Sequence, residues 1–285
     1  MTLVLREATP ADAQICGRIC YEAFTEINAH HNFPPEFPDV ETPIGLLSMM
    51  FAHPGFYAVV AERRGVVIGS NVLDERSTIA GIGPISVAPQ AQNSGAGREL
   101  MLHVMERAKS RHFPGVRLVQ AAFHNRSLSL YARLGFDARE PLSCMKGPPI
   151  GTKIPGYPVR QATQADQAAC NQLCLRVHGH ERGGELRDAI EQGATTVVEH
   201  AGCISGYATG IGYFAHAVGE TDRDLQALLA AVPSFVSPGF LLPTRNAEMF
   251  RWCLANRLRV VHPMMLMTLG LYNEPQGAYL PSILY

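Results

Sequence analysis

The chain has 285 residues, of which 47% are hydrophobic and 17% are charged, and its formal net charge is −1 at pH 7. This length and composition suit two domains, each able to bury a sizeable core. The balanced charge gives no electrostatic reason to expect nucleic acid, and no apolar run reaches the roughly 18 residues that a membrane span needs.

The N-terminus and the cysteines indicate the compartment. The opening "MTLVLREATPADA" lacks the basic and apolar regions of a signal peptide. The seven cysteines are odd in number and lie inside apolar patterns, which favours reduced thiols over a disulfide framework. We therefore expect a cytoplasmic protein, monomeric or homodimeric, that binds neither nucleic acid nor a membrane.

The first elements of the chain recur later in the sequence. "LREATPADAQICGRIC" (5–20) aligns without a gap with "VRQATQADQAACNQLC" (159–174), and the predicted hairpin "AVVAERRGVVIGS" (58–70) has a counterpart in "TVVEHAGCISGYA" (196–208). The aligned pairs include Arg6 with Arg160, Asp12 with Asp166, Cys16 with Cys170 and Cys20 with Cys174. Each cysteine pair is spaced i, i+4 on a helix, as in some metal or redox sites. Two copies in equivalent places favour packing instead.

A strand, a tight loop and an amphipathic helix are predicted over residues 84–108, "PISVAPQAQNSGAGRELMLHVMERA". The apolar residues from Leu100 to Ala108 recur three or four apart, and the strand around Ile85–Val87 ends at Pro89. The first turn of a helix carries unpaired N–H groups and a partial positive charge. Small residues there leave an anion free access, so this loop predicts an anion site.

The glycine spacing narrows the choice of anion. A nucleotide phosphate loop would continue with lysine after Gly97, and a dinucleotide fingerprint needs a third glycine at Leu100; neither is present. The pattern Gln92-x-x-Gly95-x-Gly97 after a strand instead resembles the acetyl-CoA pyrophosphate loop of the GNAT N-acetyltransferase superfamily. A glycine-containing turn that binds no ligand is the alternative.

A second signature follows in "VRLVQAAFHNRSLSLYARLGF" (116–136). It predicts a strand over 116–121, a helix capped by Asn125, and a left-handed C-terminal cap at Gly135. The set resembles the second GNAT signature and comprises Asn125, Tyr131, Leu134, Gly135 and Phe136. Two signatures in the right order are more specific than either alone, so the first half resembles a GNAT domain.

The second half resembles a GNAT domain without the binding loop. A Pro- and Gly-rich stretch, "KGPPIGTKIPGYP", separates the halves, and the later helix in "HAVGETDRDLQALL" begins with Glu220, Asp222 and Asp224 in place of glycines. These carboxylates would occupy the N–H groups and repel a pyrophosphate. We expect an α/β (α+β) fold of two tandem GNAT-like domains, each a mixed, mostly antiparallel sheet flanked by helices. Its parts are a catalytic domain (1–147), a linker (148–157) and a degenerate domain (158–285).

The resemblance implies an enzyme that transfers an acetyl group from acetyl-CoA to a primary amine by direct attack. It places the pantetheine arm between the strand 85–87 and the strand 116–121, and it assigns the developing oxyanion to the Val87 N–H. The implied general acid is Tyr131, because a phenol with a pKa of about 10 can protonate a departing thiolate. The implied CoA-binding residues are Ile85, Ser86, Val87, Gln92, Asn93, Ser94, Gly95, Ala96, Gly97, Arg98 and Asn125.

The residues that would bind the acceptor amine and take its proton follow no clear sequence motif. The strand "GIGPISV" lacks the glutamate base of many GNAT enzymes, so the candidates lie in "YEAFTEINAHHNFPPEFP" (21–38). They are Glu26 and His31 as bases, with Glu26, His30, His31 and Phe33 as substrate-binding residues; an imidazole accepts a proton near neutral pH. Water carrying the proton to bulk solvent is the alternative. No metal is expected, since no ligand set completes His178, His180 and Glu181.

Three functions are compatible with this sequence. The first is an N-acetyltransferase for a small-molecule amine, the second a non-catalytic acyl-CoA-binding sensor, and the third an N-acetyltransferase for a protein or peptide amine. We further expect the second half, with its apolar tail "NEPQGAYLPSILY", to pack near residues 26–37 and to help form the acceptor pocket. On this hypothesis residues 1–147 alone would bind CoA but lose most acetyl transfer.

Overall fold

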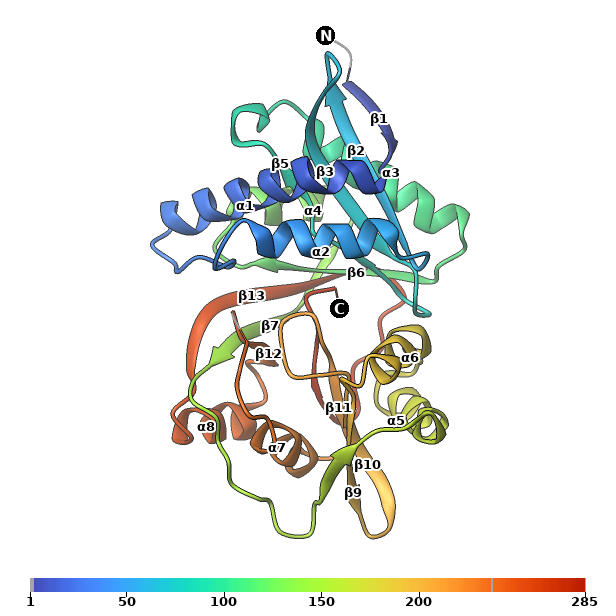
Figure 1. The fold of residues 1–285 in the computed structure, drawn as a ribbon, viewed down its shortest axis with the longest axis vertical. Coiled ribbons are helices and arrows are strands. Elements are labelled where there is room, and N and C mark those ends of the chain that lie inside the picture. The colour runs from blue at the N-terminus through green and yellow to red at the C-terminus, as the bar shows by residue number, and fades with distance from the viewer. Residues whose placement is uncertain (1–2, 237, 285) are drawn as a thin grey trace.

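The computed structural model describes residues 3–236 and 238–284. The chain forms two sheets with helices packed against them, and the first half lies above the second in Figure 1. Among these residues the strands pair antiparallel apart from one parallel pair, β4 with β6, which confirms the predicted fold class.

The first half follows the predicted order of elements. These are β1 (Leu3–Glu7), α1 (Ala13–His30), α2 (Glu41–Ala52), β2 (Phe56–Arg63), β3 (Val66–Asp74), β4 (Ala80–Ile82), β5 (Ser86–Val87), α3 (Ala96–Ser110), β6 (Gly115–Ala121), α4 (Asn125–Arg133) and β7 (Asp137–Lys146).

The second half repeats much of this order. Its elements are β8 (Val159–Gln161), α5 (Gln167–His178), α6 (Gly183–Glu191), β9 (Thr196–His200), β10 (Cys203–Ala208), β11 (Ala217–Gly219), α7 (Asp222–Ala230), β12 (Phe240–Pro243), α8 (Ala247–Ala255), β13 (Arg259–Gly270) and β14 (Ala278–Leu280).

The repeated start of each half folds in the same way. Arg6 donates to Asp12 over 2.8 Å, and Arg160 donates to Asp166 over the same distance. A threonine and the aspartate three residues later form a capping box in both copies. The i, i+4 cysteines are buried and free, and burial raises the pKa of Cys16 to about 11. They therefore serve as packing residues, as the repeat predicts.

Strands of the two halves are exchanged within one sheet. The nine-stranded sheet runs β1-β2-β3-β4-β6-β13-β7-β12, with β5 paired to β3, and the five-stranded sheet runs β14-β11-β10-β9-β8. Thus β13 of the second half pairs with β6 and β7, while β12 pairs with the other edge of β7. β6 and β12 are equivalent strands, since each precedes the helix of the second signature in its own half, and β7 and β13 are the equivalent strands that follow it. The exchange is reciprocal, because β13 pairs with β6 of the other half and β7 pairs with β12 of the other half.

This exchange bears on the predicted domains. The linker 148–157 separates the two halves of the sequence, but the first sheet takes β12 and β13 from beyond it. A fragment of residues 1–147 would leave β6 and β7 without the strand that lies between them. The strand order therefore gives no support to our expectation that this fragment folds and binds CoA alone, and the division into domains stays a prediction.

The C-terminal tail returns to the first half. Leu284 packs in a cluster with Cys16, Cys20 and Phe37, and its carbonyl lies directly over Gly81 of β4. Ile283 donates its N–H to the Tyr213 carbonyl over 2.7 Å. The tail thus docks on the molecule, as expected; its last residue, Tyr285, is outside the described residues.

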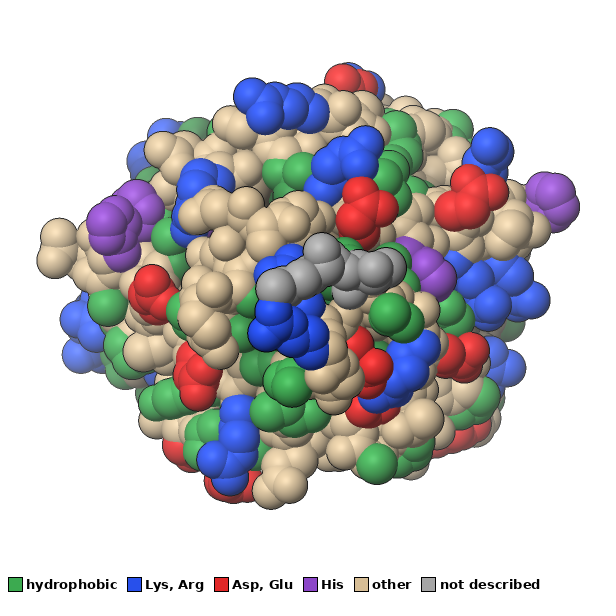
Figure 2. All heavy atoms as spheres, turned by 90° about the horizontal axis from the view of Figure 1, so that it is seen from above, with side chains coloured by type: hydrophobic (Ala, Val, Ile, Leu, Met, Phe, Trp, Pro, Cys, Tyr) green, Lys and Arg blue, Asp and Glu red, His purple; other side chains and the backbone are tan. Residues whose placement is uncertain are grey.

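Two further features are the charge on the surface at one end of the molecule and the character of the helices. On the end of the molecule that is uppermost in Figure 1, basic and acidic side chains are intermixed (Figure 2). Among the described residues, no helix has both the length and the apolar character needed to cross a membrane.

Candidate active site

Two strands of the first sheet diverge where the predicted cofactor loop begins. β4 pairs with β6 only at Ala80–Val116 and Gly81–Arg117. β5 continues in the same direction but pairs with β3, through Gly69–Val87 and Ser70–Ser86. The edge of β6 beyond Arg117 therefore separates from β5. The predicted strand shortens to Ser86–Val87, and Ile85 lies just before it.

The loop after β5 leaves the start of α3 open. Gly95 precedes the helix with a φ of +87°, a left-handed conformation that favours glycine, and no side chain caps the helix. A Cβ placed on Gly97 would meet only the Val87 side chain, at 3.8 Å. The N–H groups around Gly95, Ala96 and Gly97 thus face no bulky group, which is the geometry that an anion needs.

Side chains in the loop hold its shape. Arg126 of α4 donates to Asn93 Oδ1 over 3.1 Å and to Gln92 Oε1 over 3.0 Å, and Ser94 Oγ donates to the Ala91 carbonyl over 2.6 Å. The predicted ligand Arg98 is exposed and pairs with Glu99 over 2.7 Å. Arg126, which no sequence pattern marked, ties the loop to α4 one residue after the second signature begins.

Tyr131 lies in the core of the first half. Only 6% of it is exposed, and burial raises its pKa to about 12, although a hydrogen bond with Ser127 opposes that rise. Ser127 Oγ in turn lies 2.7 Å from His124 Nδ1. Tyr131 is therefore protonated at neutral pH and connects through Ser127 to an imidazole. This chain of contacts suits a proton donor, and its role stays a prediction.

The start of α4 differs from expectation by one residue. The cap position is His124, Asn125 is the first helical residue, and no side chain caps the helix. Asn246, the counterpart in the second half, does cap its helix by accepting the Met249 N–H over 3.1 Å. In the first turn of α4, Ser127 Oγ instead lies 2.7 Å from Nδ1 of His124, the residue before Asn125.

The predicted acceptor residues divide into two groups. Glu26 and His30 are exposed near the end of α1, whereas His31 and Phe33 are half-buried. Phe33 stacks on Phe123 with ring centroids 4.1 Å apart, and His31 lies 5.3 Å from the same ring. The structure thus gathers His31 and Phe33 around Phe123, a residue beside the second signature that the sequence analysis did not single out.

The second half closes this side of the site. His262 of β13 lies 5.7 Å from the Phe33 ring, and its Nε2 is 3.0 Å from the Pro34 carbonyl. Tyr213, also from the second half, is buried next to the same loop. The second half therefore contacts the loop at Pro34 and Glu36, while Asn32, Pro34 and Pro35 keep an exposed surface. Its contribution to an acceptor pocket stays a prediction.

Glu36 is a buried acid that the sequence analysis passed over. Its side chain is 9% exposed, and Tyr213 and Asn28 lie within hydrogen-bonding reach of the carboxylate. Burial raises its pKa to about 7, and the two hydrogen bonds limit that rise. The available signal was its setting in "PPEFP", where an acid stands between a proline and a phenylalanine.

The corresponding site of the second half is filled by its own chain. β14 pairs with β11 from Ala217–Leu280 to Gly219–Ala278. β11 leads into α7 as β5 leads into α3, so β14 occupies the edge that is open beside β5. Thr221 and Asp224 form a capping box at the start of α7, and Asp222 accepts from Asn246 over 2.7 Å. Both edge and helix start are thus occupied by protein groups.

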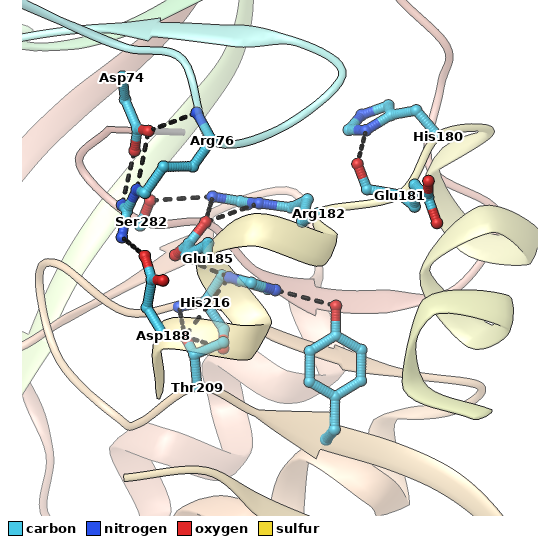
Figure 3. A network of polar contacts seen from close by, with 11 residues as sticks. Asp74, Arg76, His180, Glu181, Arg182, Glu185, Asp188, Thr209, His216 and Ser282 are labelled. Carbon is cyan, nitrogen blue, oxygen red and sulfur yellow. Dashed lines mark hydrogen bonds and ion pairs between the residues drawn. The ribbon is translucent and has the colours of Figure 1, made fainter. Parts of the chain in front are cut away.

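A buried polar network joins the halves (Figure 3). Arg182 donates to Glu185 over 2.6 Å, and Glu185 lies 2.9 Å from His216 Nδ1. At the edge of the network, Arg76 of the first half binds Asp188 over 3.0 Å. The described residues contain no group of three or more metal-ligating side chains close enough to hold an ion.

Comparisons with known proteins agree with this geometry. Residues 20–136 match the model of the acetyltransferase (GNAT) family. A "Putative Acetyltransferase" of Pyrococcus horikoshii has 16% identity and a TM-score of 0.76, covering 97% of this chain and 94% of its own. A GCN5-related N-acetyltransferase of Sphaerobacter thermophilus has 16% identity and a TM-score of 0.62, with 95% and 96% covered.

A third structure shares the two-part organisation. A tandem GNAT protein from the clavulanic acid biosynthesis pathway has 15% identity and a TM-score of 0.57, covering 94% of this chain and 98% of its own. At these identities the structures show a shared fold. No curated protein sequence matches the chain. Residues 20–136 thus match the acetyltransferase (GNAT) family, and the chain as a whole shares the fold of a tandem GNAT protein.

Proposed function

We propose that this protein transfers the acetyl group of acetyl-CoA to the primary amine of a small molecule, at a single site in the first half. The observation that carries the proposal is the open start of α3 beside the divergence of β5 from β6. An anion fits against the bare N–H groups around Gly97, and an extended arm fits along β5. The bound thioester would supply the acetyl group.

The chain's own residues supply the rest of the chemistry in this proposal. The Val87 N–H would donate to the carbonyl oxygen as negative charge develops on it. Tyr131 would give a proton to the departing sulfur, since its buried phenol stays protonated at neutral pH. Phe33 and Phe123 would wall the acceptor side.

A small acceptor is favoured over a protein chain because the second half packs against this loop. His262 contacts the loop at Pro34, and Tyr213 contacts it at Glu36. An extended peptide would need an open groove at the same place.

Acetyl-CoA-dependent release of free thiol across a panel of small amines tests this function. We expect turnover of some amines, with the acetylated amine as product. Tight CoA binding without turnover of any amine would favour a sensor, and turnover of peptides alone would favour a protein acetyltransferase.

Calorimetry on the same protein tests the assignment to one half. Because β14 and the Thr221–Asp224 box occupy the second site, we expect one CoA per chain. Two equivalent sites would contradict this assignment.

A further inference from the structure

The Glu36 carboxylate is buried beside the predicted acceptor site without a cation against it. Among the described residues, no lysine, arginine or histidine makes an ion pair with it within 4.0 Å; its hydrogen-bonding neighbours are Asn28 of α1 and Tyr213 of the second half. A buried carboxylate is costly unless it is paired, hydrogen-bonded or protonated. A single acid kept in this state therefore calls for an explanation beyond packing.

Its position links the acceptor loop to β5. The Cys20 thiol of α1 lies within hydrogen-bonding reach of Ser86 on β5, and the charge of Glu36 adds to burial in raising the pKa of that thiol. Phe37, the next residue, packs in the same cluster as Cys20 and Leu284. Glu36 therefore lies on the α1 side of the sheet, close to the strand that leads into the cofactor loop.

We infer that Glu36 takes the proton from the acceptor amine and that Tyr213, from the second half, positions it. This inference rests on the proposed function. An aliphatic ammonium has a pKa of about 10, so its nitrogen has no free lone pair at neutral pH. A buried carboxylate attracts the cation and removes its proton more effectively than an exposed one, whose pKa is near 4.3.

The proton balance of the reaction closes with these residues. The ammonium loses one proton to Glu36, which passes it to solvent. The nitrogen then forms the C–N bond as the C–S bond breaks, and it loses its second proton to solvent. Tyr131 gives one proton to the sulfur and regains one from solvent. One ammonium and one thioester thus become one amide, one thiol and one released proton.

The groups around Glu36 remain neutral over the working range of pH. They are Cys20 on α1, Cys144 on β7 and Tyr213 on the second half, and burial is the main cause that raises the pKa of each. The titration of Glu36 near neutral pH is therefore not coupled to that of another group among them. The exposed candidates Glu26 and His30 lack such an enclosure.

Direct titration of the carboxylate provides a test that needs no acceptor. The ¹³C-carboxyl signal that disappears in Glu36→Gln, from protein labelled at glutamate, should titrate near pH 7. In Tyr213→Phe the same signal should titrate at higher pH, because the hydrogen bond that lowers the pKa is lost. Glutamine keeps the shape of glutamate and its contacts with Asn28 and Tyr213, so the variant should fold.

Kinetics on the same variants test the role in catalysis. Glu36→Gln should leave the dissociation constant of CoA unchanged, lower kcat/KM by about 10²-fold or more, and remove the acidic limb of its pH profile. The loss should be smaller for weakly basic amines, which carry no proton at the assay pH. Glu22→Gln, at an exposed glutamate of the same helix α1, is the matched control, and it should retain wild-type kcat/KM.

The outcomes separate two failures. If the wild type binds CoA but acetylates no amine, the proposed function is wrong, and the role of Glu36 fails with it. If the wild type acetylates amines, then a Glu36 signal that titrates below about pH 5, or wild-type kcat/KM in Glu36→Gln, overturns this inference alone.

Discussion

At the scale of single residues, the shape and openness of the predicted cofactor loop depend on two glycines, which carry no side chain. Gly95 adopts a left-handed conformation, so any side chain there adds strain, whereas Gly97 has ordinary helical geometry and room for a Cβ. The two glycines therefore serve different purposes. Gly95 shapes the turn, and Gly97 keeps the start of the helix clear, so a test of ligand binding belongs at Gly97.

A charge change at Gly97 should abolish CoA binding without unfolding the protein. In Gly97→Asp the carboxylate occupies the helix start and repels a pyrophosphate, while it interacts favourably with the helix dipole. We expect at least about a 100-fold loss of CoA affinity by calorimetry, at unchanged thermal stability. Gly97→Asn has nearly the same shape without the charge and should lose much less. Equal losses in the two variants would show that the effect is steric.

Removal of one hydroxyl should separate chemistry from binding. Tyr131→Phe deletes the phenol O–H, while Ser127 keeps its contact with His124. We expect unchanged CoA affinity and a fall in turnover of about 10²-fold or more, measured as thiol release. Tyr57→Phe is the control, because it also removes a phenol that contacts a neighbouring side chain: Tyr57 on β2 lies within hydrogen-bonding distance of His103 on α3. Wild-type turnover of Tyr131→Phe, at a pH where chemistry is rate-limiting, would exclude the tyrosine as the acid.

At the scale of elements, the turn between α5 and α6 is packed more deeply than its polar sequence indicates. His178 and His180 are both almost fully buried, next to Arg182. Burial, followed by the charge of Arg182, lowers the pKa of His180 to about 4. This polar segment therefore stays folded best when its imidazoles are neutral.

The depressed pKa makes the segment sensitive to acid. The unfolded chain binds a proton at His180 below a pKa of about 6.5, whereas the folded chain does so only near 4. Its contribution to the free energy of unfolding is therefore complete above pH 6.5 and falls by up to about 1.4 kcal/mol per pH unit down to pH 4. Glu36 acts in the opposite direction, since its raised pKa favours the folded state as the pH falls.

A variant isolates the histidine from this opposing effect. Denaturant unfolding of the wild type and of His180→Asn should show a stability difference that narrows from pH 7.5 to pH 5.5. The same measurement on His30→Asn, at an exposed position of α1, is the control for replacing a histidine outside the buried turn. A constant difference for His180→Asn would mean that the imidazole has the same pKa in the folded and the unfolded chain, and it would contradict this prediction.

At the scale of the whole molecule, the sequence predicted those features that depend on residues close together in the chain. The repeated Arg6–Asp12 unit, the helix after Gly95 and the left-handed Gly135 follow from spacing and turn chemistry, and all three are present. The exchange of β13 into the first sheet was not predicted, because the sequence of a long apolar strand does not identify the strands with which it pairs. Glu36 was missed for a related reason. Its burial depends on Tyr213, which is distant in the sequence.

The exchanged strands predict that the two halves form one folding unit. β13 pairs with β6 over Met264–Gly270 and with β7 over Arg259–Thr268, so neither half can separate without breaking the sheet. A protease site inserted at Gly151 in the linker, and then cleaved, should give two fragments that co-elute in size exclusion and unfold in one transition with the CoA-binding site intact. The same protein left uncleaved is the control. Separation of the fragments under native conditions, or two unfolding transitions of the cleaved protein, would show that the halves are independent despite the shared sheet.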